Sequence, residues 1–225
     1  MTTRCHYFRR YQFRGKVMKR IVHLAIYEGI SDWEFGYVIA HINSPEFQQN
    51  NHSYEVKTVG RDKNSVKSKG GITMLPDLTL EELNPLDSEM LILCGSDNAA
   101  IGGISDFIQK ARLFIEQNKS IAAICGATAA LAKEGLLDER LHTSNSKEFM
   151  EMTGYSGSKY YVNAPAVTCN RVITASGIEP VAFAIEIFKT LNLYSEKTLS
   201  SWEKLFYQRD INGFFELLGE VKSNA

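Results

Sequence analysis

Cysteine is scarce in this sequence, and its spacing excludes two common uses of the residue. The four cysteines are Cys5, Cys94, Cys125 and Cys169, and no two of them form a C-x-x-C pair. Cysteines spaced this widely indicate neither a zinc site nor a disulfide framework. Histidine, cysteine and aspartate do not cluster either, so we expect no metal, and no P-loop or other motif indicates a cofactor. Reduced thiols in a cytoplasmic protein are the simplest interpretation.

Long apolar runs and an excess of one charge are also missing. No run of about 18 apolar residues exists, which argues against a transmembrane helix. The 25 basic and 26 acidic residues give a net charge of −1. This balance creates no overall field toward nucleic acid or a membrane, so we expect neither as a partner. With 225 residues, of which 44% are hydrophobic, the chain has the composition of a globular protein with one main domain.

Residues 1–19 depart from this balance. They contain basic and aromatic side chains but no acidic one. Such an arm can contact nucleic acid or anionic lipid, which keeps a nucleic-acid-binding regulator open as an alternative. The simpler interpretations are a disordered tail, or a start codon assigned too early, because Met18 directly precedes the first predicted strand. The arm lacks the apolar core of a secretory signal.

Residues 20–192 alternate between strand and helix patterns. Strands are predicted at 21–27, 54–59, 90–93, 120–124, 160–162, 166–168 and 172–174, with a hairpin at 66–74. Helices are predicted at 32–43, capped by Ser31 or Asp32, and at 104–117, 127–133 and about 179–191. This alternation predicts a mostly parallel sheet with helices on both faces.

A helical extension is predicted in residues 193–225. Its apolar side chains are Trp202, Leu205, Phe206, Phe214, Phe215, Leu217 and Leu218. An apolar face of this size needs a cover. We expect it either to pack on the main domain or to form the interface of a homodimer.

One stretch, residues 119–133, joins a strand to a helix without a spacer. Ser120–Ile124 is a short apolar run typical of a strand buried on both faces, and Ala127–Lys133 favours helix. Cys125 and Gly126 lie at the junction, as in the G-x-S-x-G nucleophile elbow. We expect the helix N-terminus to stabilise a thiolate at Cys125, and the Gly126 N–H to bind an oxyanion. The alternative is an inert, buried cysteine that serves as a small hydrophobe.

The segment A-A-I-C-G-A-T, residues 122–128, resembles the nucleophile elbow of the ThiJ/PfpI superfamily. Its members are related to class I glutamine amidotransferase domains and include intracellular proteases, amidases, glyoxalases, chaperones and redox sensors. The resemblance covers about residues 20–192. It implies a flavodoxin-like three-layer α/β sandwich, followed here by the C-terminal extension, and it implies a homodimer.

The resemblance also implies roles for two further residues. In the superfamily a glutamate at the start of the first helix hydrogen-bonds the cysteine, and Glu34 has the matching position. Burial beside sulfur would raise the pKa of this carboxyl. Without the resemblance, Glu34 would simply complement a helix N-terminus. Ser96 stands where the family has a glycine whose N–H completes the oxyanion hole, although Gly95-Ser96 also suits an ordinary tight turn.

The family histidine has no direct match. Many members place it directly after the cysteine, where this chain has Gly126, or on the strand after the elbow helix, where a gapless match gives Ser144. His142 would share a face with Ser144 on a strand, so it is our candidate general base. The alternative is a polar residue at a strand edge. This departure argues against proteolysis, because acyl transfer needs a base near neutral pH.

These observations predict a cysteine-dependent hydrolase or amidase-like enzyme acting through Cys125. Its substrate would be a small molecule: an amide, a glutamine-like compound or a reactive carbonyl. The alternative is a non-catalytic redox or stress sensor, or a binding module, that uses an oxidisable Cys125.

Overall fold

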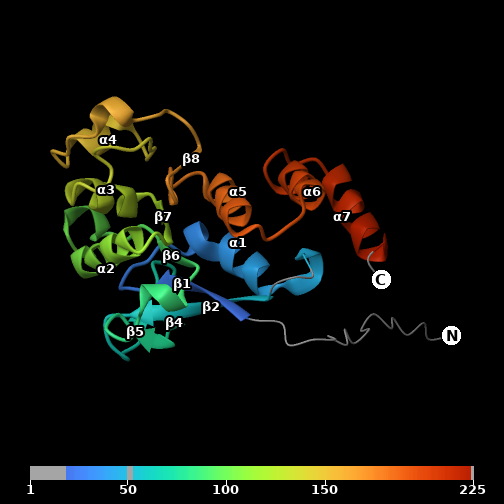
Figure 1. The fold of residues 1–225 in the computed structure, drawn as a ribbon, viewed down its shortest axis with the longest axis horizontal. Helices are drawn as coiled ribbons and strands as arrows, with labels where there is room; N and C mark the ends of the chain where they lie inside the picture. The colour runs from blue at the N-terminus through green and yellow to red at the C-terminus, as the bar shows by residue number, and fades with distance from the viewer. Residues whose placement is uncertain (1–18, 50–52, 224–225) are drawn as a thin grey trace.

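The structure is a computed structural model that describes residues 19–49 and 53–223 (Figure 1). The predicted tail, residues 1–19, lies outside the described residues except for Lys19, which begins the first strand.

The described residues form a seven-stranded sheet with the order β5-β2-β1-β6-β7-β9-β8. All neighbours are parallel except β8 and β9, which are antiparallel. The strands are β1 (Lys19–Ala25), β2 (Ser53–Gly60), β5 (Leu78–Thr79), β6 (Met90–Leu93), β7 (Ser120–Ile124), β8 (Ala166–Cys169) and β9 (Val172–Ala175). The central strands β6, β7 and β9 are buried along their whole length, as expected for parallel strands covered on both faces.

Helices cover both faces of this sheet. The long ones are α1 (Asp32–Asn43), α2 (Ser105–Glu116), α3 (Gly126–Lys133) and α5 (Pro180–Leu191). The chain moves one way across the sheet from β1 to β2 and the other way from β6 to β7, and such crossovers are right-handed. The two crossovers therefore place α1 on one face and α2 on the other, and α5 packs beside α1 (Figure 1). The predicted flavodoxin-like three-layer sandwich is confirmed.

Short elements complete the chain. They are α4 (Lys147–Glu151) and the 3-10 turns η1 (Pro45–Phe47), η2 (Pro85–Asp87), η3 (Ala99–Ile101) and η4 (Ser158–Tyr160). The predicted hairpin is present as β3 (Val66–Lys67) and β4 (Thr73–Met74), which pair antiparallel.

The order of the strands reverses between β1 and β6, which are neighbours in the sheet. In open α/β sheets, ligands bind beyond the carboxyl ends of the strands at such a switch point. The segments that follow β1, β6, β7 and β9 reach this edge. We therefore expect a ligand site among the residues at these four strand ends.

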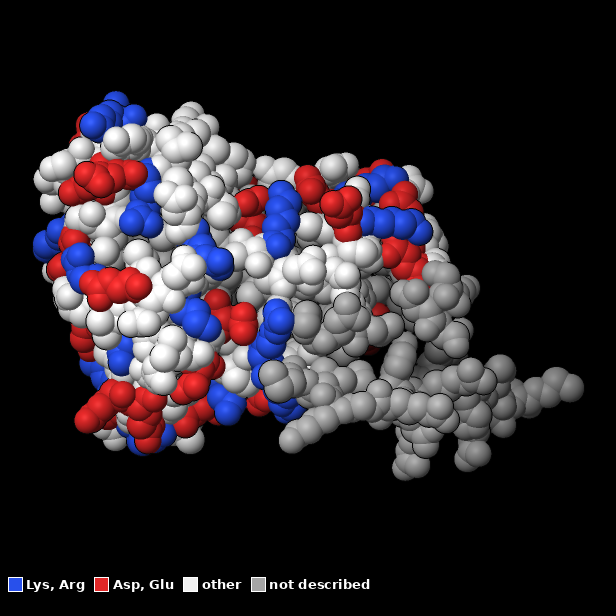
Figure 2. All heavy atoms as spheres, in the orientation of Figure 1, with Lys and Arg blue, Asp and Glu red and all other residues white. Residues whose placement is uncertain are grey.

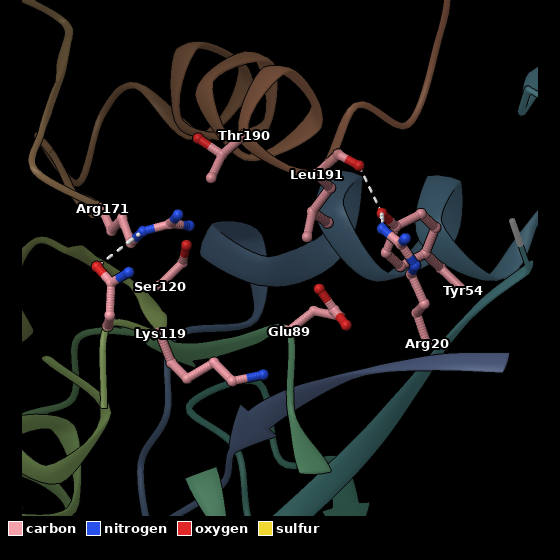
Figure 3. A pocket seen from close by; sticks show the side chains of 9 residues that line it. Arg20, Tyr54, Glu89, Lys119, Ser120, Arg171, Thr190 and Leu191 are labelled. Atoms are coloured by element: carbon pink, nitrogen blue, oxygen red, sulfur yellow. Dashed lines mark hydrogen bonds between the residues drawn. The ribbon is translucent and has the colours of Figure 1, made fainter. Parts of the chain in front are cut away.

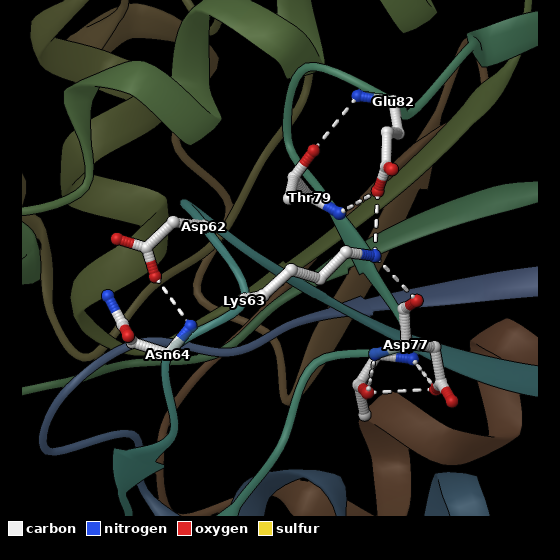
Figure 4. Close-up of polar contacts among 7 residues, drawn as sticks. Asp62, Lys63, Asn64, Asp77, Thr79 and Glu82 are labelled. Carbon is white, nitrogen blue, oxygen red and sulfur yellow. Dashed lines mark hydrogen bonds and ion pairs between the residues drawn. The ribbon is translucent and has the colours of Figure 1, made fainter.

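Polar contacts hold the short edge strand β5 (Figure 4). Lys63 forms an ion pair with Glu82 at 2.8 Å and donates to the Asp77 carbonyl at 3.0 Å. The Asp77 carboxylate accepts hydrogen bonds from the N–H and the hydroxyl of Thr58. Because the Lys63 and Glu82 side chains are exposed to water, their ion pair stabilises the fold by only about 0–1 kcal/mol.

Two helices, α6 (Glu196–Phe206) and α7 (Asn212–Ser223), follow the sandwich. Trp202 of α6 is fully buried, and its ring lies 5.1 Å from His41, 5.2 Å from Phe188 and 4.6 Å from Phe206. The apolar face of α6 therefore packs on α1 and α5. The homodimer stays a prediction.

The charges on the surface are mixed. Figure 2 shows acidic and basic side chains interspersed over the face of the molecule that it presents. This face therefore offers no broad field of one sign.

One local prediction was wrong, and another, the cap of α1 at Ser31, is confirmed in position but not in its side-chain hydrogen bond. Residues 160–162 are not a strand: η4 ends at Tyr160, and Tyr161 makes a single bridge with His142. Within the described chain, Ser31 precedes α1 but makes no side-chain cap hydrogen bond, and Asp32 instead accepts from the Gly70 N–H at 2.6 Å. The Asp32 carboxylate thus binds the β3–β4 hairpin rather than its own helix.

The Trp202 cluster predicts the cost of losing the α6 anchor. Replacing Trp202 with alanine should lower the free energy of unfolding by about 3–5 kcal/mol, because the cavity cannot close fully. Urea denaturation measures this loss. The matched control is Phe215→Ala on the exposed side of α7, which should change stability by less than about 0.5 kcal/mol. Equal effects of the two variants would contradict the packing of α6.

Candidate functional site

Cys125 occupies a strained turn between β7 and α3. Its backbone has φ 58° and ψ −128°, a conformation that costs a residue with a side chain about 1–3 kcal/mol. The Cys125 N–H donates to the Ala175 carbonyl at 3.1 Å, and the Cys125 carbonyl accepts from the Thr128 N–H at 3.0 Å. The ends of β9 and α3 therefore fix the turn. The predicted sharp strand-to-helix junction is confirmed. Cys125 is partly exposed there.

Two glycines leave room for the sulfur. A methyl group built on Gly177 would lie 2.7 Å from Sγ of Cys125, and one built on Gly95 would lie 3.1 Å from it. The Gly95 methyl would also lie 3.1 Å from Oε1 of Glu34. The ends of β6, β7 and β9 and the first turn of α1 therefore meet around one sulfur atom.

Glu34 lies in the first turn of α1 and is fully buried. Its Oε2 accepts a hydrogen bond from the Gly95 N–H at 2.5 Å, while the Gly95 carbonyl accepts one from the Ser31 N–H at 3.0 Å. In a capping box the glutamate would bond to the N–H of the cap residue itself. Here the Glu34 carboxyl and the Ser31 N–H both bond to Gly95, in the loop after β6. This loop therefore holds the carboxyl beside Cys125.

Burial raises the pKa of Glu34 to about 7, although the Gly95 N–H and the Cys125 thiol oppose this shift. The carboxyl therefore changes its charge near neutral pH, as is suited to a group that accepts and returns a proton. Burial raises this pKa as expected, whereas the hydrogen bond with the Cys125 sulfur lowers it.

The prediction for the thiol was wrong in its net direction. Burial raises the pKa of Cys125, and the Glu34 charge raises it further. The Asn145 amide and the Gly126 N–H lower it, as expected of donors near sulfur, but they do not outweigh the first two causes. The resting site therefore holds a thiol beside a carboxyl that can take its proton.

Ser96 and Gly126 lie next to each other. A methyl group built on Gly126 would be 3.2 Å from the Ala99 side chain and 3.6 Å from the Ser96 carbonyl, because η3 packs on the start of α3. Neither glycine nor serine offers a side-chain charge here. Their backbone N–H groups remain the predicted oxyanion donors.

His142 is not brought to this site. Its ring is buried, with Nδ1 2.8 Å from the Arg140 carbonyl and Nε2 2.9 Å from the Tyr155 hydroxyl. Burial lowers its pKa. No hydrogen bond joins it to Cys125 or Glu34 in the part of the chain that the structure describes.

Asn145 reaches the sulfur instead, with its Nδ2 3.4 Å from Sγ of Cys125. The sequence pointed to His142 and Ser144 in this region, and Asn145 was not singled out. The alternation of side chains along a strand does not apply here, because His142 makes an isolated bridge and does not belong to a strand.

A cavity of about 270 Å³ opens at the opposite edge of the sheet, at the amino ends of its strands (Figure 3). Its basic side chains already have acceptors. Lys119 donates to the Ser88 carbonyl at 2.8 Å, and Arg171 donates to the Asn118 side chain at 3.1 Å. The described residues also contain no group of three histidine, cysteine or acidic side chains placed to hold a metal. We therefore take the four strand ends around Cys125 as the candidate site.

Comparison with known proteins decides the family. The model of the DJ-1/PfpI family matches residues 19–190. The chain belongs to the DJ-1/PfpI family. This confirms the resemblance drawn from the elbow, and the match ends just before α6.

Relatives within the family match nearly the whole chain. A Bacillus subtilis (strain 168) protein named uncharacterized protease YoaZ is 38% identical over 205 residues, covering 90% of this chain and 98% of that protein. The crystal structure of a thiJ/pfpI family protein from Bacillus anthracis has a TM-score of 0.84 at 35% identity, covering 91% of this chain and 98% of the other. A DJ-1 superfamily protein from Agrobacterium tumefaciens has a TM-score of 0.73 at 29% identity, covering 83% and 98%. In the present chain, none of the helices in the described residues has the length and apolar character of a membrane span.

The raised pKa of Glu34 predicts how stability depends on pH. A buried carboxyl whose folded pKa exceeds its unfolded value favours folding at low pH, and this advantage is lost as pH rises from about 4.5 to about 7. We expect wild-type stability to fall across this window by on the order of 3 kcal/mol relative to Glu34→Gln. Urea denaturation from pH 4 to 8 measures both curves. Parallel curves would show that Glu34 titrates normally.

Proposed function

We propose that the protein is a cysteine-dependent hydrolase or amidase-like enzyme that acts on a small molecule through Cys125. One observation carries the proposal: the partly exposed thiol stands on a strained elbow beside the buried Glu34 carboxyl, whose pKa is about 7. A nucleophile and a proton acceptor held together in this way are the minimum for covalent catalysis. The printed name of the YoaZ relative, a protease, supports hydrolysis as the reaction class.

The first half of the reaction needs one proton acceptor. As Sγ of Cys125 bonds to the substrate carbonyl carbon, its proton passes to the Glu34 carboxylate. The carbonyl π electrons move to oxygen, where the Gly126 and Ser96 N–H groups would bind the negative charge. With an amide, the C–N bond then breaks and Glu34 gives the proton to the departing amine, leaving a thioester. With an aldehyde, the same proton goes to oxygen and gives a thiohemiacetal.

The second half repeats this order of proton transfers, with water as the nucleophile. Water attacks the thioester carbon while Glu34 accepts its proton. The C–S bond breaks, the acid leaves, and the proton returns to the sulfur of Cys125. Glu34 thus acts alternately as base and acid, with a pKa suited to both.

A redox sensor is the second candidate, and the placement of His142 favours it. With no histidine beside the sulfur, Glu34 alone must serve every proton transfer of amide hydrolysis, whereas attack of the sulfur on peroxide needs fewer proton transfers. In that step the S–O bond forms, the O–O bond breaks, and the departing hydroxide takes the proton that Glu34 accepted from the thiol, so that water leaves and a sulfenic acid remains.

Turnover distinguishes the two candidates. We expect wild type to convert at least one member of a panel of amides, glutamine and methylglyoxal, and Cys125→Ala to lose about 1,000-fold or more of that rate. Cys169→Ala, which removes a thiol from β8, is the matched control and should keep the wild-type rate. Equal turnover by wild type and Cys125→Ala would overturn the enzyme proposal.

Oxidation of the cysteines by peroxide tests the sensor proposal. Titration with peroxide, followed by mass spectrometry, should oxidise Cys125 before Cys94 and Cys169 if the protein is a sensor. Selective oxidation without turnover would favour the sensor, whereas oxidation of all three at one rate would count against it.

A further inference from the structure

The sulfur of Cys125 faces a side-chain amide whose orientation is fixed. The Nδ2 of Asn145 lies 3.4 Å from Sγ, and its Oδ1 accepts a hydrogen bond from the Gly177 N–H at 2.9 Å. Only an oxygen can accept from that N–H, so the amide cannot be turned round. The NH2 group therefore points its hydrogens toward the sulfur.

Gly177 is itself held in place. The Trp33 indole N–H donates to the Gly177 carbonyl at 3.1 Å, and a methyl group built on Gly177 would lie 3.3 Å from Oδ1 of Asn145. Trp33 directly precedes Glu34 in α1. One helix turn thus supplies the carboxyl beside the sulfur and, through Gly177, supports the amide.

The residues on both sides of Asn145 are anchored as well. The Ser144 hydroxyl lies 2.6 Å from the Thr128 hydroxyl, and the Ser146 side chain accepts from the Phe149 N–H at 3.1 Å. The backbone at residue 145 is therefore set by contacts to α3 and α4. Asn145 is exposed, but its amide is already held by the Gly177 N–H, so it loses less freedom on binding the sulfur than an unheld surface side chain would.

We propose that Asn145 is a positioning residue that orients the sulfur of Cys125 and favours its ionised form while carrying no proton itself. An amide neither gains nor loses a proton near neutral pH, whereas a histidine at the same place would do both. Proton transfer at the site then belongs to Glu34. The inference rests on the proposed function only in requiring that Cys125 be the reactive thiol.

The test compares wild type with Asn145→Asp. Aspartate keeps an oxygen that can accept from the Gly177 N–H, but it replaces the donor facing sulfur with a second oxygen and adds a negative charge. The rate of Cys125 alkylation by iodoacetamide, read at pH 6–10 from the mass of the Cys125 peptide, should fall about tenfold at pH 7.5, with the apparent thiol pKa raised. Because the added charge alone would slow alkylation, Asn145→Ala, which removes the donor without adding a charge, should also react several-fold more slowly and with a raised apparent thiol pKa. A merely structural role, in which Asn145 only holds Gly177, would leave the alkylation rate and the apparent thiol pKa of Asn145→Ala unchanged and would overturn the proposal.

Asn118→Asp is the matched control. It makes the same chemical change at the opposite edge of the sheet, where Asn118 accepts from Arg171, and it should leave Cys125 alkylation at the wild-type rate. A tenfold fall in this control would show that a negative charge far from the sulfur lowers the thiolate fraction of Cys125 as much, and would overturn the assignment. Matching urea midpoints for wild type and every variant ensure that folded chains are compared.

Alkylation needs no substrate, so it separates this inference from the proposed function. If Cys125→Ala retains turnover, the enzyme proposal fails, yet the pH profile of alkylation still decides the role of Asn145. If turnover depends on Cys125 but Asn145→Asp reacts like wild type, only the inference about Asn145 is overturned.

Discussion

The site depends on a carboxyl group held out of water beside a thiol. Removing a charged carboxylate from water is costly unless hydrogen bonds or a neighbouring proton compensate. Glu34 has a strong hydrogen bond from the Gly95 N–H, but burial still raises its pKa to about 7. The same burial and the Glu34 charge raise the pKa of Cys125. Ionising Glu34 and Cys125 together therefore costs free energy, so we expect the two groups to share one proton, which can move between them.

The fold supplies this arrangement through the reversal of strand order between β1 and β6. Four strand ends meet there, and side chains at two of them would fill the space that the sulfur needs, which explains glycine at 95 and 177. The strain at Cys125 is offset by hydrogen bonds to β9 and α3 and by a core that continues to Trp202. A stable scaffold thus tolerates an unfavourable backbone at one functional residue.

Many of the helices and strands were predictable from the sequence, because the local preference of each segment agrees with its place in the fold. The helix at 32–43 and the strands at 90–93 and 120–124 match the observed elements, since their apolar patterns reflect the faces that they bury. The elbow was predictable from small residues at a strand-to-helix junction. Residues 142–145 were not, because side chains from α3 and α4 and an isolated bridge, rather than strand alternation, decide where they point. The thiol pKa was mispredicted for a similar reason: a helix N-terminus is visible in sequence, whereas burial next to Glu34 is not.

Glu34 holds a proton near neutral pH because it is buried beside Cys125. Infrared difference spectroscopy of the protonated carboxyl C=O stretch, with Glu34→Gln to identify the band, measures this protonation. We expect a band that titrates with a midpoint near pH 7 and is absent from the variant. A midpoint near 4.5, the value of an ordinary glutamate, would contradict it.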